Sequence, residues 1–193
     1  MNILSYVRAC AFCGCSWGKV EWLCSLCEEE FLSRIKISQR MVSPNIEHQY
    51  LLDWSPDDRF IDCLVYSLKG KGLHETYEKI ALIFSIFKEI RAPGYIYYPS
   101  KGKVDHGSQW GSSFAEIFDC PSEALLMEEG GKQALLSRKE RAERAFIPPV
   151  KKAQNPCFVD DIVTSGATAK AVYKALGQPV KLTVWSLFYR RNL

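Results

Sequence analysis

Residues 157–168 read Cys157-Phe-Val-Asp-Asp-Ile-Val-Thr-Ser-Gly-Ala-Thr168. An apolar run of strand type leads through two adjacent aspartates into a loop of small and hydroxylated residues, and a helical pattern follows from Ala167 to Leu176. In an open α/β sheet, ligands bind beyond the carboxyl ends of the strands, which is where this loop falls. The stretch therefore predicts both an α/β fold and a binding site.

The loop after the aspartates has the composition of a phosphate-binding turn. Its backbone N–H groups and hydroxyls would lie at a helix N-terminus, whose dipole favours an anion, and its small side chains let the backbone approach that anion closely. The residues concerned are Thr164, Ser165, Gly166, Ala167 and Thr168. The sequence contains neither the GxxxxGK[ST] motif of nucleoside triphosphate sites nor the GxGxxG motif of dinucleotide sites.

The carboxylates of Asp160 and Asp161 narrow the expected ligand. A carboxylate pair beside a phosphate repels it unless the carboxylates have a partner of their own. Because carboxylates only accept hydrogen bonds, they suit the hydroxyls of a sugar, or a divalent cation that neutralises both anions. We expect a phosphorylated sugar with free hydroxyls, accompanied by Mg²⁺. Ordinary loop capping by the two aspartates is the simpler alternative.

Five of the eight cysteines fall within residues 10–27. Two Cys-x-x-Cys pairs can complete a tetrahedral zinc site, and the spacing is typical of structural zinc. The alternative, a disulfide framework, needs an oxidising compartment, and the N-terminus has no secretory pattern. Cys15 is expected to be a spare thiol beside the site. The predicted zinc ligands are Cys10, Cys13, Cys24 and Cys27.

The composition is that of an ordinary globular chain, with 193 residues, 47% apolar, 24% charged and a formal net charge of +3. These values disfavour disorder, and no apolar run approaches the roughly 18 residues of a membrane span. We expect a cytoplasmic protein with a zinc-binding knuckle at residues 1–32 and a second domain at residues 33–193. Alternating helix and strand patterns in the second domain predict a parallel sheet flanked by helices.

The three histidines carry no recognisable motif. His48 and His106 fall in polar segments, and His74 starts a helical pattern. Each is expected at the surface rather than in a site.

Residues 158–168 resemble the phosphoribosyl pyrophosphate (PRPP) motif of the type I phosphoribosyltransferases. The resemblance implies that Asp160 and Asp161 hold ribose hydroxyls, and that residues 164–168 bind the 5-phosphate. Residues 98–103, Tyr-Pro-Ser-Lys-Gly-Lys, resemble the segment that meets the pyrophosphate. This segment adds to the expected site Ser100, Lys101 and Gly102.

A four-cysteine knuckle ahead of such a domain resembles the ComF family of competence proteins, over nearly the whole chain. Residues 59–72 and 131–141 match patterns of that family, whose Arg-Gly-Phe-Asn segment is replaced here by Asp105-His-Gly-Ser-Gln-Trp110. The resemblance implies a type I phosphoribosyltransferase-like domain that acts in DNA uptake during natural transformation and contacts a competence helicase or recombination factor. An active phosphoribosyltransferase of nucleotide salvage and a PRPP-sensing regulator stay open as alternatives.

Basic residues are concentrated in one segment. Residues 132–152 hold seven basic and two acidic side chains, a net +5, so the rest of a chain of net charge +3 carries −2. Such a local patch is the electrostatic footprint of a polyanion partner, here expected to be single-stranded DNA. A solvated helix face and the pyrophosphate side of the same pocket are the alternatives. The residues expected to contact DNA are Lys132, Arg138, Lys139, Arg141 and Arg144.

Overall fold

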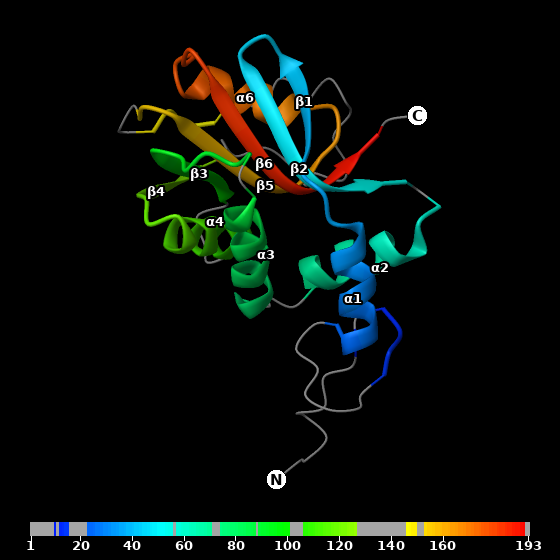
Figure 1. Cartoon of the computed structure of the whole chain (residues 1–193). Helices are drawn as coiled ribbons and strands as arrows, with labels where there is room; N and C mark the ends of the chain where they lie inside the picture. The colour runs from blue at the N-terminus through cyan, green and yellow to red at the C-terminus, as the bar shows by residue number, and fades with distance from the viewer. Residues whose placement is uncertain are drawn as a thin grey trace.

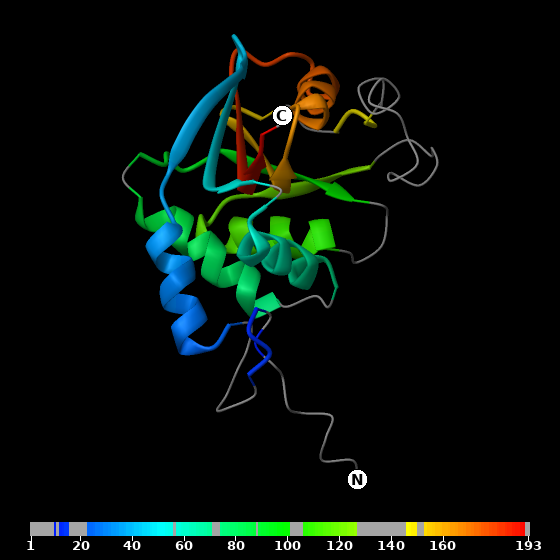
Figure 2. The ribbon, with the colours of Figure 1, turned by 90° about the vertical axis from the view of Figure 1, so that its right-hand side faces the viewer.

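The computed structural model describes residues 10, 12–15, 23–55, 57–70, 74–87, 89–100, 106–126, 146–149 and 153–191. Within these ranges the chain has a mixed α/β fold, with one six-stranded sheet and helices on both of its faces (Figures 1 and 2). The predicted fold class, an α/β sheet flanked by helices, is confirmed. No helix in the described part of the chain has the length and apolarity that crossing a bilayer requires.

The sheet is parallel except at one edge. Its strand order is β1-β2-β6-β5-β3-β4. The strands are β1 Ser38–Ser43, β2 Ile46–Trp54, β3 Tyr95–Ser100, β4 Ser122–Leu126, β5 Pro156–Val163 and β6 Leu182–Arg190. β1 and β2 form an antiparallel hairpin, and the other neighbouring strands pair in parallel.

The helices cover the sheet from both sides. They are α1 Ser25–Arg34, α2 Arg59–Gly70, α3 His74–Ile86, α4 His106–Ile117 and α6 Ala167–Ala175. α4 connects β3 to β4 and α6 connects β5 to β6, and these two crossovers run in opposite directions across the sheet. Right-handed crossovers in opposite directions place their helices on opposite faces. Figure 2 shows α6 on one side of the sheet and α2, α3 and α4 on the other.

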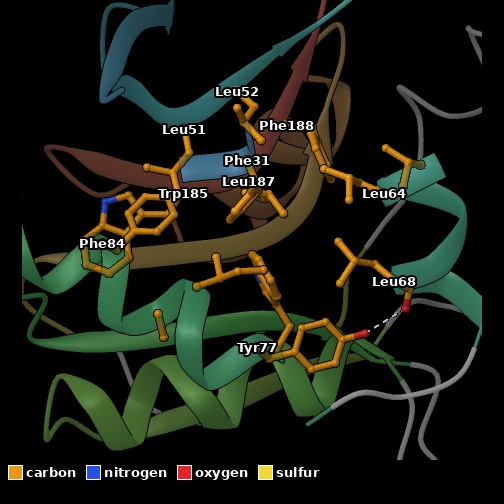
Figure 3. Close-up of a cluster of buried hydrophobic side chains, with 14 of the residues drawn as sticks. Phe31, Leu51, Leu52, Leu64, Leu68, Tyr77, Phe84, Trp185, Leu187 and Phe188 are labelled. Carbon is orange, nitrogen blue, oxygen red and sulfur yellow. Dashed lines mark hydrogen bonds between the residues drawn. The ribbon is translucent and has the colours of Figure 1, made fainter. Parts of the chain in front are cut away.

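Two hydrophobic clusters hold these layers together. The larger lies between the sheet and helices α2, α3 and α4, and includes the fully buried rings of Phe84 and Trp185 (Figure 3). The ring of Phe114 belongs to the same cluster and is also fully buried. The centroid of the Phe84 ring lies 5.2 Å from that of Phe114 and 5.6 Å from that of Trp185. Such aromatic pairs add about 0.5–1.5 kcal/mol each beyond their buried area. The smaller cluster packs α6 on the opposite face, through residues such as Val172 and Phe158.

A close contact fixes α4 against the sheet. Gly111 of α4 is buried, and a Cβ at this position would overlap the ring of Tyr98 on β3. Because glycine has no side chain, the helix can lie directly on the strand that precedes it. This contact sets the position of the first residue of α4, His106, relative to the carboxyl ends of the strands.

Candidate functional site

β3 and β5 stop pairing before either strand ends. Their parallel pairing covers residues 95–97 and 156–158, and its last pair is Tyr97 with Phe158. On their outer sides, β3 pairs with β4 up to Ser100 and β5 pairs with β6 up to Val163. The chain leaves the two strands toward opposite edges of the sheet, so the strand order reverses between them. Open α/β sheets bind their ligands at such a reversal.

Both predicted aspartates lie in the part of β5 that has separated from β3. The sequence pattern suggested that they follow the strand, but β5 continues to Val163, because Asp160 pairs with Ser186 and Val163 with Tyr189 on β6. The Oδ1 of Asp160 accepts a hydrogen bond from the backbone N–H of Asp161 at 3.0 Å. Alternation along the strand directs the two half-buried carboxylates to opposite faces of the sheet.

Asp161 faces α4, where it meets a histidine. Its Oδ2 lies 3.2 Å from Nε2 of His106. Nδ1 of His106 is hydrogen-bonded to the hydroxyl of Tyr77, which donates to the carbonyl of Leu68 at 2.9 Å (Figure 3). Burial, together with the negative charge of Asp161, raises the pKa of Tyr77 above its ordinary value. His106, expected at the surface, is half-buried beside Asp161.

The turn after β5 leads to the N-terminus of α6. Gly166 precedes α6 with φ at 75°, in the left-handed region, and a Cβ there would overlap Val42 on β1. The N-cap residue Gly166 makes no side-chain hydrogen bond, and Oγ of Ser165 accepts a hydrogen bond from the N–H of Ala167 at 3.4 Å. Free N–H groups at the start of a helix form an anion-binding site. Thr164 and Thr168 are exposed beside it.

Sequence reasoning missed a cation at this turn. Arg40 of β1 donates to the carbonyl of Thr164 at 3.4 Å, and its guanidinium lies 4.2 Å from the ring centroid of Tyr189. Its partner in the hairpin register, His48, is fully buried, so the expectation of a surface histidine is wrong at this position. Burial, reinforced by the charge of Arg40, lowers the pKa of His48 to about 3. No local sequence signal links Arg40 to Thr164, because only the folded sheet brings them together.

Of the remaining predicted site residues, the structure describes Ser100 alone. Ser100 is buried at the end of β3, on the strand next to Asp161. Lys101 and Gly102 lie outside the described residues. So do the predicted DNA-contacting residues Lys132, Arg138, Lys139, Arg141 and Arg144.

The structure brings the four predicted zinc ligands together. The Sγ atoms of Cys10, Cys13, Cys24 and Cys27 all lie within 4.8 Å of one another, and those of Cys13 and Cys24 are 3.7 Å apart. Four thiolates around Zn²⁺ at 2.3 Å are separated by about 3.8 Å, so this donor set fits a structural zinc ion. The first pair is shaped by Gly14, at φ 72°, whose N–H donates to the carbonyl of Cys10. The second pair spans the first turn of α1.

The environment of the cluster favours thiolates at two of its positions. Burial opposes ionisation of Cys10, but backbone hydrogen bonds, the strongest from Cys24, outweigh it and lower the pKa to about 6. A backbone hydrogen bond from Cys27 likewise lowers the pKa of Cys24. Thiol hydrogen bonds with Cys13 and Cys24 raise the pKa of Cys15 to about 12. Burial is the largest cause that raises the pKa of Cys27, another predicted ligand, so these shifts do not separate the four predicted ligands from Cys15.

Comparison with known proteins gives fold neighbours only. No family model matches the chain, and no curated protein matches it. Among solved structures, it is similar to the hypoxanthine phosphoribosyltransferase of Trypanosoma cruzi in complex with the product IMP (16% identity, TM-score 0.38, covering 60% of this chain and 65% of that one). It is also similar to the purine phosphoribosyltransferase of Pyrococcus horikoshii (13% identity, TM-score 0.39, covering 60% of this chain and 80% of that one). A third similar structure is the adenine phosphoribosyltransferase of Leishmania donovani (13% identity, TM-score 0.38, covering 79% of this chain and 86% of that one). The chain spans less than two thirds of the length of the hypoxanthine enzymes.

Substitution of one cluster cysteine tests the metal site. We expect one Zn²⁺ per purified chain, and Cys24→Ser should lose it because three thiolates leave the tetrahedron incomplete. The variant should also melt at a lower temperature, since Cys10 and Cys27 belong to the main hydrophobic cluster. Metal analysis by mass spectrometry and thermal unfolding measure both effects. Cys15→Ser is the matched control; full zinc content in Cys24→Ser, or loss of zinc in Cys15→Ser, would contradict the assignment.

The turn at Gly166 makes a prediction about stability. Gly166→Ala should lower the free energy of unfolding by about 1–3 kcal/mol, because alanine is strained at positive φ and its Cβ overlaps Val42. Urea denaturation measures the loss. The double variant Val42→Ala/Gly166→Ala should recover the packing part of the loss but not the backbone part. A Gly166→Ala protein as stable as the wild type would show that the turn does not have this geometry.

Proposed function

We propose that this chain binds PRPP, or a similar phosphorylated sugar, where the carboxyl ends of β3 and β5 separate. One observation carries the proposal: an adjacent carboxylate pair and a helix N-terminus flank the position at which the strand order reverses. The carboxylates only accept hydrogen bonds and the helix N-terminus only donates them. A ligand that presents both hydroxyls and a phosphate satisfies the two sets of groups together.

Each part of the ligand has a counterpart in the chain. The 5-phosphate would accept from the first backbone N–H groups of α6, with the positive charge of Arg40 close to the same turn. The ribose hydroxyls would donate to Asp160 and Asp161. The pyrophosphate, with its Mg²⁺, would lie toward Ser100, Lys101 and Gly102, as the resemblance of that segment implies.

The knuckle supports a more specific assignment. A four-cysteine cluster that fits Zn²⁺ precedes the sugar-phosphate site in this chain, which is the combination that resembles the ComF family. We propose residues 1–32 as a zinc-binding knuckle and residues 33–193 as a PRPP-binding domain, acting in the cytoplasm during DNA uptake. A competence helicase or recombination factor would be its protein partner. If the chain is an active transferase, PRPP would lose pyrophosphate from C1 through an oxocarbenium-like state while a nitrogen base attacks the same carbon. A sensor would bind PRPP without this step.

The charge distribution supports a second ligand, single-stranded DNA. The net +5 of residues 132–152, against −2 for the rest of the chain, concentrates positive charge where a phosphate backbone would be bound. The contacting residues we propose are Lys132, Arg138, Lys139, Arg141 and Arg144.

Titration with PRPP tests the sugar-phosphate site. The double variant Asp160→Asn/Asp161→Asn should bind PRPP at least about tenfold more weakly than the wild type, with and without Mg²⁺, because it loses charged acceptors for the hydroxyls. Isothermal titration calorimetry measures the affinities. Glu116→Gln, an exposed acidic residue on α4, is the control and should bind as the wild type does. Equal binding by the double variant and the wild type would overturn the proposal.

Salt dependence tests the DNA proposal. If the five basic side chains each neutralise one phosphate of a single strand, a log–log plot of affinity against salt should have a slope of about −3.5. Fluorescence anisotropy with a labelled oligonucleotide measures it, and replacing all five by Gln should flatten the slope. A flat response of the wild type would contradict DNA binding. Displacement of the DNA by PRPP would instead locate the basic residues at the sugar-phosphate pocket.

A further inference from the structure

The first strand of the sheet contacts the turn between β5 and α6, residues 164–168, at two points. A guanidinium N–H of Arg40 on β1 donates to the backbone carbonyl of Thr164 at 3.4 Å. Further along β1, Val42 lies where a Cβ on Gly166 would overlap it. One strand therefore contacts both the start and the centre of the turn that we propose as the phosphate site.

The guanidinium of Arg40 is supported by an aromatic ring. It lies 4.2 Å from the ring centroid of Tyr189 on β6, within the range of a cation–π contact. Tyr189 pairs in register with Val163, the residue that precedes Thr164, so neighbouring strands present the ring and the carbonyl. The ring of Tyr189 also packs against that of Tyr50 on β2, with their centroids 5.0 Å apart. The half-buried side chain of Arg40 therefore has contacts that define its position.

The hydrogen bond from Arg40 determines the direction of the next backbone N–H. The described residues contain no cis peptide bond, and in a trans peptide the C=O and N–H groups point in opposite directions. The carbonyl of Thr164 points to Arg40, so the N–H of Ser165, in the same peptide unit, points away from it. A peptide without this donor is free to rotate and to turn its oxygen toward an anion at the start of α6. A carbonyl oxygen repels a phosphate there, whereas an N–H donates to it.

We propose that Arg40 is a positioning residue of the phosphate site, which holds the carbonyl of Thr164 so that the N–H of Ser165 can donate to the 5-phosphate of the sugar ligand. The guanidinium keeps its positive charge at physiological pH, and this charge also favours an anion at the turn. The identity of the ligand rests on the proposed function, whereas the contact between Arg40 and Thr164 does not.

Carbonyl NMR tests the contact without any ligand. A hydrogen bond moves the ¹³C signal of the accepting carbonyl downfield. In Arg40→Met, which keeps an unbranched apolar stem but has no donor, the carbonyl signal of Thr164 should move upfield, and in Arg40→Lys it should move less. Arg34→Met is the matched control, because Arg34 also lies over a ring, that of Phe60, but belongs to α1, well away from α6 (Figures 1 and 2). An unchanged Thr164 signal in Arg40→Met would overturn the proposal.

Affinity for two sugar phosphates tests the positioning role. Arg40→Met should bind PRPP and ribose 5-phosphate about tenfold more weakly than the wild type, because both ligands carry the 5-phosphate. Arg40→Lys, which keeps a charged donor, should retain most of the affinity, and Arg34→Met should bind as the wild type does. Isothermal titration calorimetry at constant salt measures the affinities. Saturation with ribose 5-phosphate should move the amide proton signal of Ser165 downfield in the wild type and much less in Arg40→Met.

The support of Arg40 by the ring of Tyr189 provides a second variant. Tyr189→Leu leaves Arg40 in place but removes the ring, and it should weaken binding of both ligands about threefold. Tyr189→Phe keeps the ring and should lose less affinity than Tyr189→Leu. Urea denaturation of each variant shows whether the fold is retained.

The outcomes separate this proposal from the proposed function. The role of Arg40 would be overturned by equal affinity of Arg40→Met and the wild type, by an equal response of the Ser165 amide in the two proteins, or by a loss confined to PRPP. A loss in Arg40→Lys as large as in Arg40→Met would overturn it as well. If the wild type binds neither ligand, the proposed function fails, and the carbonyl signal of Thr164 still decides whether Arg40 holds the turn.

Discussion

Parallel pairing between β3 and β5 ends at Tyr97 and Phe158, and the candidate site follows from this early end. Beyond that pair each strand is held only by its outer neighbour, so the end of β5 that carries Asp160 and Asp161 is separated from β3. The crossovers after the two strands leave in opposite directions and place their helices on opposite faces. The N-terminus of α4 therefore approaches β5 from one face, and the turn into α6 leaves it on the other. Both helix N-termini therefore lie at the edge of the sheet where the parallel strands end.

The cysteine cluster is connected to the same framework by packing. Cys10 and Cys27 belong to the hydrophobic cluster that also contains Phe31 of α1 and Leu64 of α2. A zinc ion would stabilise the start of the chain directly, since a segment of this size has too little apolar surface for a core of its own. Through these contacts it would also support the face of the sheet on which α4 lies. The division of the chain at residue 32 stays a prediction.

A local sequence pattern predicted the elements around the candidate site, and no local pattern predicted β1. Residues 157–168 predicted the strand, the turn and the helix because their pattern is local and depends on composition. β1 has no such pattern, since its half-buried positions are occupied by Ser38 and Arg40 as well as Val42. His106 gave no signal because its partners come from α3 and β5, which are distant in sequence. Its position depends on where Gly111 allows α4 to lie, a property of packing and not of sequence periodicity.

A crystal structure with PRPP and Mg²⁺ would show whether the separated ends of β3 and β5 bind a sugar phosphate. We expect the 5-phosphate within hydrogen-bonding distance of the backbone N–H groups of residues 166–168, and the ribose hydroxyls on Asp160 and Asp161. Ligand density elsewhere on the molecule, with these groups unchanged from the ligand-free structure, would contradict this expectation.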